Sequence, residues 1–419
     1  MSTRVKVLVA ALVMLILAAA AAAQSGVDVA QAREIFSEIG GILQDLHDIT
    51  GFQIKHRVPA EIITRDKVKE FLQQRIKEAS TPEEIRVEEL ILRKFGFVPP
   101  DFDLAKNTVD LLTEQAAAFY DFHRKRLFIT DWTPSATREP ALVHELGHAL
   151  ADQNVNLEKF IKQGRKSDDG SLARLAVMEG QASWLMAEYL ARKAGQSLAT
   201  SPALMETMAH TIESGASEFP VFASEPLYLR ETLVFPYSQG LLFQNAVYQR
   251  FQQKAFEEVF RRAPVSTQQI LHPDKYFAGL APARPALPQL RHAHGYKRIA
   301  EGTVGELDHA VLLEQYGSRE ESKAVSPHWR GGAYALLEHR SPERVVLLYA
   351  VEWDDAESAG RYFRLYRQVL EKKSKNLIIE SESETEMSGR CDDVHFLVRL
   401  KGNVVTSVEG AENALAPVR

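Results

Sequence analysis

The sequence predicts an α+β protein with at least two domains, and three observations lead to that fold class. First, the chain has 419 residues, which is more than a single hydrophobic core usually organises. Second, apolar residues recur at helical spacing through most of the chain up to about residue 276. Third, alternating strand-like runs around one long helix follow residue 305. We therefore expect a mostly helical domain at 24–300 and a C-terminal α+β domain at 301–419.

The first 23 residues have the pattern of a secretory signal peptide. A short basic head precedes an apolar run over 7–20, and three alanines at 21–23 come before Gln24. We expect cleavage after Ala23, a secreted or periplasmic protein, and no stable membrane insertion afterwards. An uncleaved anchor is the alternative, because the run is nearly long enough to span a bilayer.

The net charge and the cysteine content bear on two questions: whether the protein binds nucleic acid, and whether disulfide bonds stabilise it. A net charge of −6 and a pI near 6.2 give no electrostatic case for binding nucleic acid, so none is expected as a partner. Cys391 is the only cysteine, which rules out an intramolecular disulfide. The exported protein must therefore be held by its core, either alone or with a metal.

The N-terminal part of the first domain, 27–112, reads as helical and carries no chemistry that the sequence reveals. Glycine and proline separate its segments, and 59–64 is a candidate short strand. The four apolar-periodic segments lie near 28–47, 65–78, 82–95 and 103–115.

A β-hairpin is expected where the core of this domain, 115–255, begins. Ala118–Tyr120 and Leu127–Thr130 are β-like runs, and a polar turn joins them. His123 lies in that turn and is expected to be exposed rather than a ligand.

The stretch from Glu139 to Asn154 predicts a buried helix whose polar groups share one side. Thr137 is the expected cap, and Pro140 is tolerated in the first turn. At about 100° per residue, His144 and His148 project one above the other, with Glu145 and Asp152 beside them. The rest is Ala, Leu, Val and Gly, and buried imidazoles and carboxylates need each other, backbone carbonyls or a metal.

A second helix, expected from about Gly170 to Lys193, places one carboxylate in an apolar stripe. Glu179 is the exception among residues that all face the core. It needs a cation from elsewhere, which is either a metal held by the first helix or an arginine such as Arg174. The apolar members of the stripe are Leu172, Leu175, Ala176, Ala182, Met186 and Leu190.

His-Glu-x-x-His at 144–148, with Glu-Gly-x-Ala at 179–182, resembles the zinc metallopeptidases of gluzincin type. The chain also resembles uncharacterised exported bacterial zincin-like proteins. The resemblance covers roughly 115–250 and implies a zincin-like domain that binds one zinc ion through His144, His148 and Glu179. It implies that Glu145 is the general base that activates the zinc-bound water. It also implies a peptide or protein substrate, paired with the strand before the zinc helix.

Two departures from the family pattern leave points open. Thermolysin-like enzymes carry an aspartate four residues after the third ligand, where this chain has Ser183. Asp152 or a backbone carbonyl is then the candidate partner of a zinc histidine. The Gly-x-Met-Glu-Asn segment of the aminopeptidase N group is absent, which favours an endopeptidase over an aminopeptidase.

A transition-state donor is expected from Tyr237. Tyr237-Ser-Gln-Gly240 resembles the Tyr-x-x-Gly of the aminopeptidase N group, which implies that Tyr237 stabilises developing negative charge. Tyr237 is also expected to open a long helix reaching about Phe260, where the dipole would help. An ordinary packing role is the alternative, and His210, on a helix near 202–217, is then the reserve candidate.

The C-terminal part is expected to fold separately from about residue 303 and to carry no catalytic group. Arg291-His-Ala-His294 is a possible metal clip in a proline-rich segment, and 380–386 reads as an exposed charged turn. Helices are expected at 305–316 and 354–373. Strands are expected at 332–338, 345–352, 376–382, 393–400 and 403–408, and an antiparallel arrangement is expected for them.

These observations favour a secreted zinc-dependent metallopeptidase. Two other classes remain open. One is a peptidase-derived binding or chaperone-like module without turnover, which would bind metal and hydrolyse no peptide. The other is a zinc hydrolase of non-peptide amides, which would spare peptides.

Overall fold

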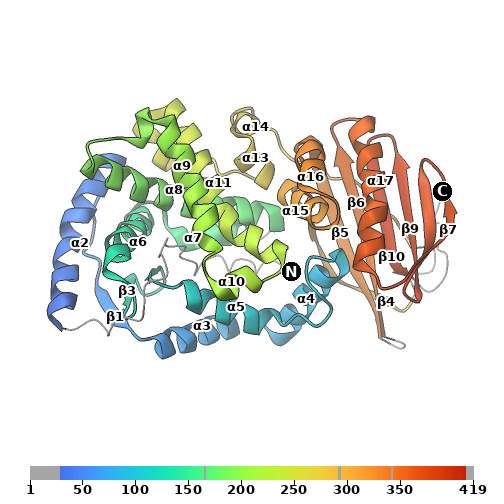
Figure 1. The fold of residues 1–419 in the computed structure, drawn as a ribbon, viewed down its shortest axis with the longest axis horizontal. Coiled ribbons are helices and arrows are strands. Elements are labelled where there is room, and N and C mark those ends of the chain that lie inside the picture. The colour runs from blue at the N-terminus through green and yellow to red at the C-terminus, as the bar shows by residue number, and fades with distance from the viewer. Residues whose placement is uncertain (1–28, 165–166, 291–293, 341–342, 412–419) are drawn as a thin grey trace.

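The computed structural model describes residues 29–164, 167–290, 294–340 and 343–411. Its fold is α+β: a helical part is followed by a large antiparallel sheet with helices on one face (Figure 1). The expected signal peptide lies outside the described residues, as does most of the histidine clip at 291–294. Within the described ranges, no helix is both long and apolar enough to cross a membrane.

The N-terminal part combines four helices with a small mixed sheet. The sheet has the order β1-β3-β2, so that β2 is an edge strand. The hairpin of β2 and β3 confirms the expected pairing, and β1 adds to it in parallel. The elements are α2 (Val29–Thr50), β1 (Ala60–Ile63), α3 (Arg65–Ala79), α4 (Pro82–Phe95), α5 (Leu104–Gln115), β2 (Ala118–Asp121) and β3 (Arg126–Thr130).

Three long helices, α6, α8 and α11, form the centre of the helical part, and shorter helices surround them. The long ones are α6 (Ser135–Val155), α8 (Asp168–Lys193) and α11 (Leu227–Phe251). The shorter ones are α7 (Leu157–Gly164), α9 (Pro202–Ala216), α10 (Pro220–Ser224), α12 (Ala255–Arg261), α13 (Thr267–Leu271) and α14 (Pro273–Phe277).

Two helix boundaries differ from expectation. Helix α6 begins at Ser135, so Thr137 lies within its first turn, where its hydroxyl donates to the Pro134 carbonyl instead of capping the helix. Helix α11 begins at Leu227 and includes Pro236, so Tyr237 does not open a helix and the dipole argument for it is wrong. The helix ends at Phe251 rather than near Phe260, because Gln252 has a φ of 52°.

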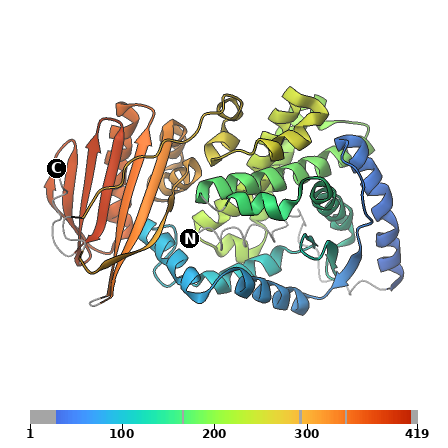
Figure 2. The same ribbon diagram turned by 180° about the vertical axis from the view of Figure 1, so that it is seen from behind.

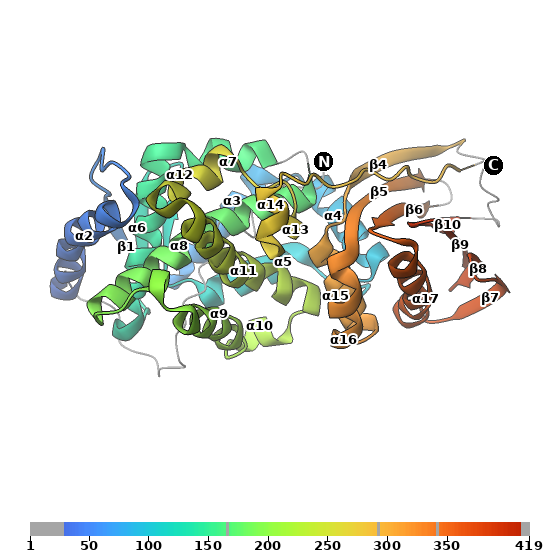
Figure 3. The ribbon, with the colours of Figure 1, turned by 90° about the horizontal axis from the view of Figure 1, so that it is seen from above.

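The C-terminal sheet has seven antiparallel strands in the order β4-β5-β6-β10-β9-β8-β7. Helices α15, α16 and α17 lie on one side of it, and an extended segment, 279–290, runs along the other (Figures 2 and 3). Leu287 and Leu290 of that segment pack against Leu337 and Leu348 of the sheet. The strands are β4 (Tyr296–Thr303), β5 (Trp329–Arg340), β6 (Glu343–Trp353), β7 (Leu377–Glu382), β8 (Glu386–Cys391), β9 (Val394–Lys401) and β10 (Val404–Ala411); the helices are α15 (Glu306–Tyr316), α16 (Arg319–Val325) and α17 (Ala356–Lys373).

Two strands of this sheet were not expected. Strand β4 starts before the expected domain boundary at 301 and pairs with β5. Strand β8 pairs with β7, so the charged stretch 380–386 is the end of one strand, a turn and the start of the next. The buried positions are only Ala300 in β4 and Met387 and Gly389 in β8, so large apolar residues do not alternate with polar ones as a sequence pattern requires.

The helical part and the C-terminal sheet share one hydrophobic core. The ring of Phe95 at the end of α4 packs edge-on against Tyr334 and Tyr349 of the sheet. The Tyr316 hydroxyl on α15 donates to the Gly96 carbonyl, and Arg86 forms an ion pair with Glu338 at 2.8 Å. The two parts therefore stabilise each other, and the expected separate folding stays a prediction.

Candidate metal centre

Three buried side chains from two helices converge where the sequence predicts a metal site. His144 and His148 come from α6, one turn apart, and Glu179 comes from the middle of α8. The two Nε2 atoms lie 3.1 Å apart, and the Glu179 Oε2 atom lies 3.1 Å from one and 3.2 Å from the other. Among the described residues, this is the one group of three or more such side chains with the spacing of a metal site.

The electrostatics of the three side chains are those of a tightly coupled buried cluster. Burial lowers the pKa of His144. Burial has the same effect on His148, but the neighbouring Glu179 carboxylate outweighs it and raises the pKa of His148 to about 9. Burial disfavours the ionised form of Glu179, yet the positive charge of His148 holds the pKa of that carboxyl below its usual value. The metal-free cluster is thus an imidazolium and a carboxylate beside a neutral imidazole.

The spacing and chemistry of the three donor atoms fit a zinc ion. Donor atoms about 2.0–2.2 Å from a tetrahedral ion lie roughly 3.3 Å from one another, close to the three separations given above. Two imidazoles and one carboxylate are also a common donor set of catalytic zinc. Hydrogen bonds alone do not satisfy all three atoms, because each hydrogen atom between them bonds only one pair well.

The carboxylate of Glu145 lies next to the donor atoms of His144, His148 and Glu179, and its two oxygens have different surroundings. Its Oε2 atom accepts a hydrogen bond from the Tyr120 amide at 2.6 Å. Its Oε1 atom lies 3.8 Å from the His144 Nε2 atom and, although buried, has no hydrogen-bond partner among the described residues. Burial raises the pKa of Glu145 to about 8. A nearby cation would lower that pKa and favour the carboxylate.

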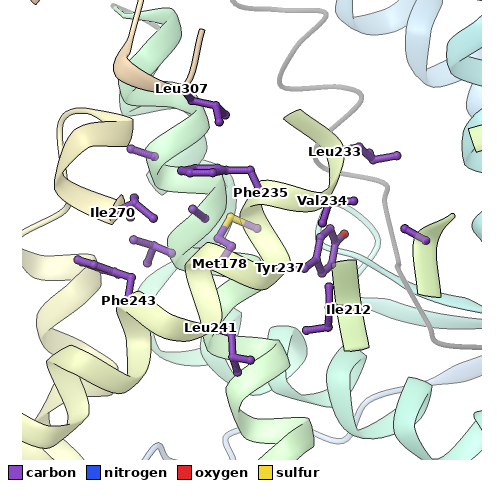
Figure 4. Packing of buried hydrophobic residues seen from close by; sticks show 14 of the residues in the cluster. Met178, Ile212, Leu233, Val234, Phe235, Tyr237, Leu241, Phe243, Ile270 and Leu307 are labelled. Atoms are coloured by element: carbon purple, nitrogen blue, oxygen red, sulfur yellow. The ribbon is translucent and has the colours of Figure 1, made fainter. Parts of the chain in front are cut away.

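Tyr237 reaches the cluster from α11, with its ring stacked at 5.9 Å from that of His144. Its hydroxyl is buried and, within the part of the chain that the structure describes, makes no hydrogen bond of normal geometry. Burial raises the pKa of Tyr237 well above its usual value, and the nearby charge of Glu179 raises it further. Figure 4 shows the ring close to Ile212 of α9 and Val234 of α11. The hydroxyl therefore stays protonated and can donate a hydrogen bond.

The glycines that follow Glu179 and Tyr237 explain why these two side chains meet. A Cβ atom at Gly180 would lie 2.2 Å from the Gly240 carbonyl carbon, and one at Gly240 would lie 2.3 Å from the Ala176 carbonyl oxygen. Helices α8 and α11 therefore cross with their backbones in contact. Neither position accepts a larger residue without moving a helix.

The structure places the other candidates away from the donor atoms. Arg174 lies over the Phe160 ring and donates to its carbonyl oxygen, so it does not pair with Glu179. His210 is exposed on α9, and His123 is exposed in its hairpin turn, as expected. The hydrogen bonds of Asp152 go to Tyr120, Lys125 and the Leu157 amide rather than to a zinc histidine.

Tyr120 is the site residue that sequence reasoning missed. The hairpin strand before the zinc helix was expected to line the site, but nothing singled out one of its residues. Its contact with Glu145 joins a strand and a helix through a backbone N–H. Every residue except proline has this group, so the sequence does not indicate the contact.

Comparisons with known proteins bear on the C-terminal part alone. A family model described as a domain of unknown function (DUF8575) matches residues 292–419. That region holds the whole seven-stranded sheet, starting just before β4. No curated protein and no solved structure matches the chain.

Proposed function

We propose that this protein is an exported zinc-dependent metallopeptidase of gluzincin type. The observation that carries the proposal is the convergence of the His144, His148 and Glu179 donor atoms within 3.2 Å of one another, beside the unused Oε1 atom of Glu145. A buried cluster of this composition is costly unless it binds a cation.

Each side chain has a separate role in this proposal. His144, His148 and Glu179 hold the ion. When bound, zinc polarises the scissile carbonyl and makes a water more acidic. Glu145 takes a proton from the attacking water and later delivers it to the leaving amine. The Tyr237 hydroxyl donates a hydrogen bond to the carbonyl oxygen as negative charge develops there.

The small sheet supports a peptide substrate. An extended peptide can add to an edge strand, and β2 is an edge strand of the small sheet beside the helix of His144 and His148, although its four residues are buried here. An endopeptidase remains the favoured form. Secretion or periplasmic export completes the proposal and rests on the sequence of the first 23 residues.

A digest of a peptide library by the zinc-loaded mature protein tests the function. The wild type should cleave peptides, and Glu145→Gln should keep zinc and fold while losing hydrolysis by orders of magnitude. Acetylated sugars and other non-peptide amides belong in the same assay. Cleavage of these amides with peptides spared would move the assignment to a zinc amidase. Zinc binding with no hydrolysis would favour a binding or chaperone-like module.

The role of Tyr237 has its own test. Tyr237→Phe removes one hydroxyl and keeps the ring, so turnover should fall by roughly 10²- to 10³-fold with little change in KM. Activity within a few-fold of the wild type would make Tyr237 a packing residue.

A further inference from the structure

Strand β2 is joined to the zinc helix at two points, and both belong to Tyr120. Its backbone N–H donates to the Glu145 Oε2 atom at 2.6 Å. Its side-chain hydroxyl donates to the Asp152 Oδ2 atom at 3.0 Å. Glu145 and Asp152 are on the same helix, α6, about two turns apart. One residue therefore bridges two turns of the helix that carries His144 and His148.

The far end of this bridge is itself firmly held. Asp152 is buried, and Lys125 from the β2–β3 turn also contacts its Oδ2 atom at 2.5 Å. Its Oδ1 atom accepts the Leu157 amide at 3.0 Å, which fixes the start of α7. Asp152 thus has charge-assisted partners on both oxygens, and such contacts are stronger than neutral ones.

At the Glu145 end of this bridge, the two carboxylate oxygens differ in their hydrogen bonds. Oε2 accepts an amide hydrogen bond, whereas Oε1 is buried, has no partner in the described ranges and lies 3.8 Å from the His144 Nε2 atom. A carboxylate that is anchored through one oxygen keeps the other in a fixed direction.

We propose that Tyr120 is the positioning residue of the general base: it anchors Oε2 of Glu145 through its amide and fixes the strand through its bond to Asp152, which makes Oε1 the proton-accepting oxygen. The inference rests on the proposed peptidase function. In the reaction, one O–H bond of water breaks, its proton goes to Oε1, and the water oxygen forms the new bond to the carbonyl carbon. The proton then passes from Oε1 to the leaving nitrogen as the C–N bond breaks, so charge and atoms balance.

Tyr120→Phe tests the bridge because it removes the bond to Asp152 and leaves the backbone amide in place. A small displacement of the base lowers turnover without altering substrate binding. We expect kcat to fall about tenfold, with KM and zinc affinity within twofold of the wild type.

Tyr189→Phe is the matched control. Tyr189 is buried to the same extent as Tyr120. Its hydroxyl also donates a hydrogen bond to a carboxylate of α6, that of Glu139, at a distance of 3.0 Å. This contact lies away from the three donor atoms. This variant should keep wild-type kcat. A loss of zinc affinity in Tyr120→Phe, or an equal fall of kcat in both variants, would mean general loosening of α6 and would overturn the positioning role.

A second readout does not depend on turnover. Hydrogen exchange of the residue-120 amide, followed by NMR, should be slow in the wild type and at least tenfold faster in Tyr120→Phe, while Tyr189→Phe leaves it unchanged. Exchange and kcat both within twofold of the wild type in Tyr120→Phe would refute the proposal. If the wild type hydrolyses nothing, the peptidase function fails, and the exchange rates still decide whether Tyr120 anchors Glu145.

Discussion

Gly180 and Gly240 meet backbone to backbone at the crossing of α8 and α11. A Cβ atom at Gly240 would come within 2.9 Å of the Gly180 Cα atom, and one at Gly180 would come within 2.5 Å of the Gly240 Cα atom. The helices that carry Glu179 and Tyr237 therefore cross with their backbones in contact, and no side chain separates them at this point. The geometry of the site depends on two residues with no functional groups.

Gly180→Ala should push the two helices apart. We expect a loss of roughly 1–3 kcal/mol of unfolding free energy, together with weaker zinc binding, measured by urea denaturation and by metal competition. Gly41→Ala is the control, because Gly41 is in helix α2 with nothing within 4 Å of an added Cβ. It should stabilise the protein by about 0.5–1 kcal/mol. Equal effects of the two substitutions would contradict the close crossing.

The start of the C-terminal part is hydrogen-bonded to the helices that carry Glu179 and Tyr237. The Thr303 hydroxyl accepts the Asp169 amide at 3.2 Å at the start of α8. The Tyr228 hydroxyl, in the first turn of α11, donates to Asp308 at 2.8 Å. The helical part should therefore need the C-terminal part in order to keep its metal site.

A chain that ends at residue 290 tests this dependence. We expect it to be less soluble than the full chain and to hold less than stoichiometric zinc, because the buried faces of α4, α8 and α11 would be exposed. Size-exclusion chromatography with elemental analysis is the measurement. A monomeric fragment with a full complement of zinc would instead restore the expectation of separate folding.

Zinc affinity should rise with pH. The pKa of His148 in the metal-free protein is about 9, so at pH 7 its imidazole is protonated and must lose that proton before it can bind a metal. Below this pKa the affinity should increase by up to about tenfold per pH unit for each proton released, and the increase should level off above it. Titration calorimetry in buffers of different ionisation enthalpy counts the protons. An affinity that does not change between pH 6.5 and 8.5 would rule out the imidazolium.

Local patterns in the sequence were enough to predict which three side chains converge at the candidate metal centre. His144 and His148 are four residues apart on one helix, and Glu179 interrupts an apolar stripe, so each can be inferred from its own segment. The crossing at Gly180 and Gly240 and the bond from Tyr120 to Glu145 could not be inferred in this way. These contacts join segments far apart in the chain and use backbone atoms.

The predicted start of α11 was wrong because it too depends on contacts between segments far apart in the chain. The helix that Tyr237 was expected to open begins instead at Leu227, directly after Pro226, and continues through Pro236. Packing of α11 against α8 outweighs the lost hydrogen bond. The fold class needed none of these details, because the change from helical to alternating spacing near residue 305 was sufficient to predict it.

Zinc content of the purified mature protein tests the central claim most directly, because every proposed role depends on His144, His148 and Glu179 binding one ion. Elemental analysis should give one zinc per chain for the wild type and almost none for His148→Ala, while Glu145→Gln, which alters a neighbour that is not a ligand, should retain it. Zinc well below one per chain, at a level that His148→Ala leaves unchanged, would contradict the metal centre and the function proposed from it.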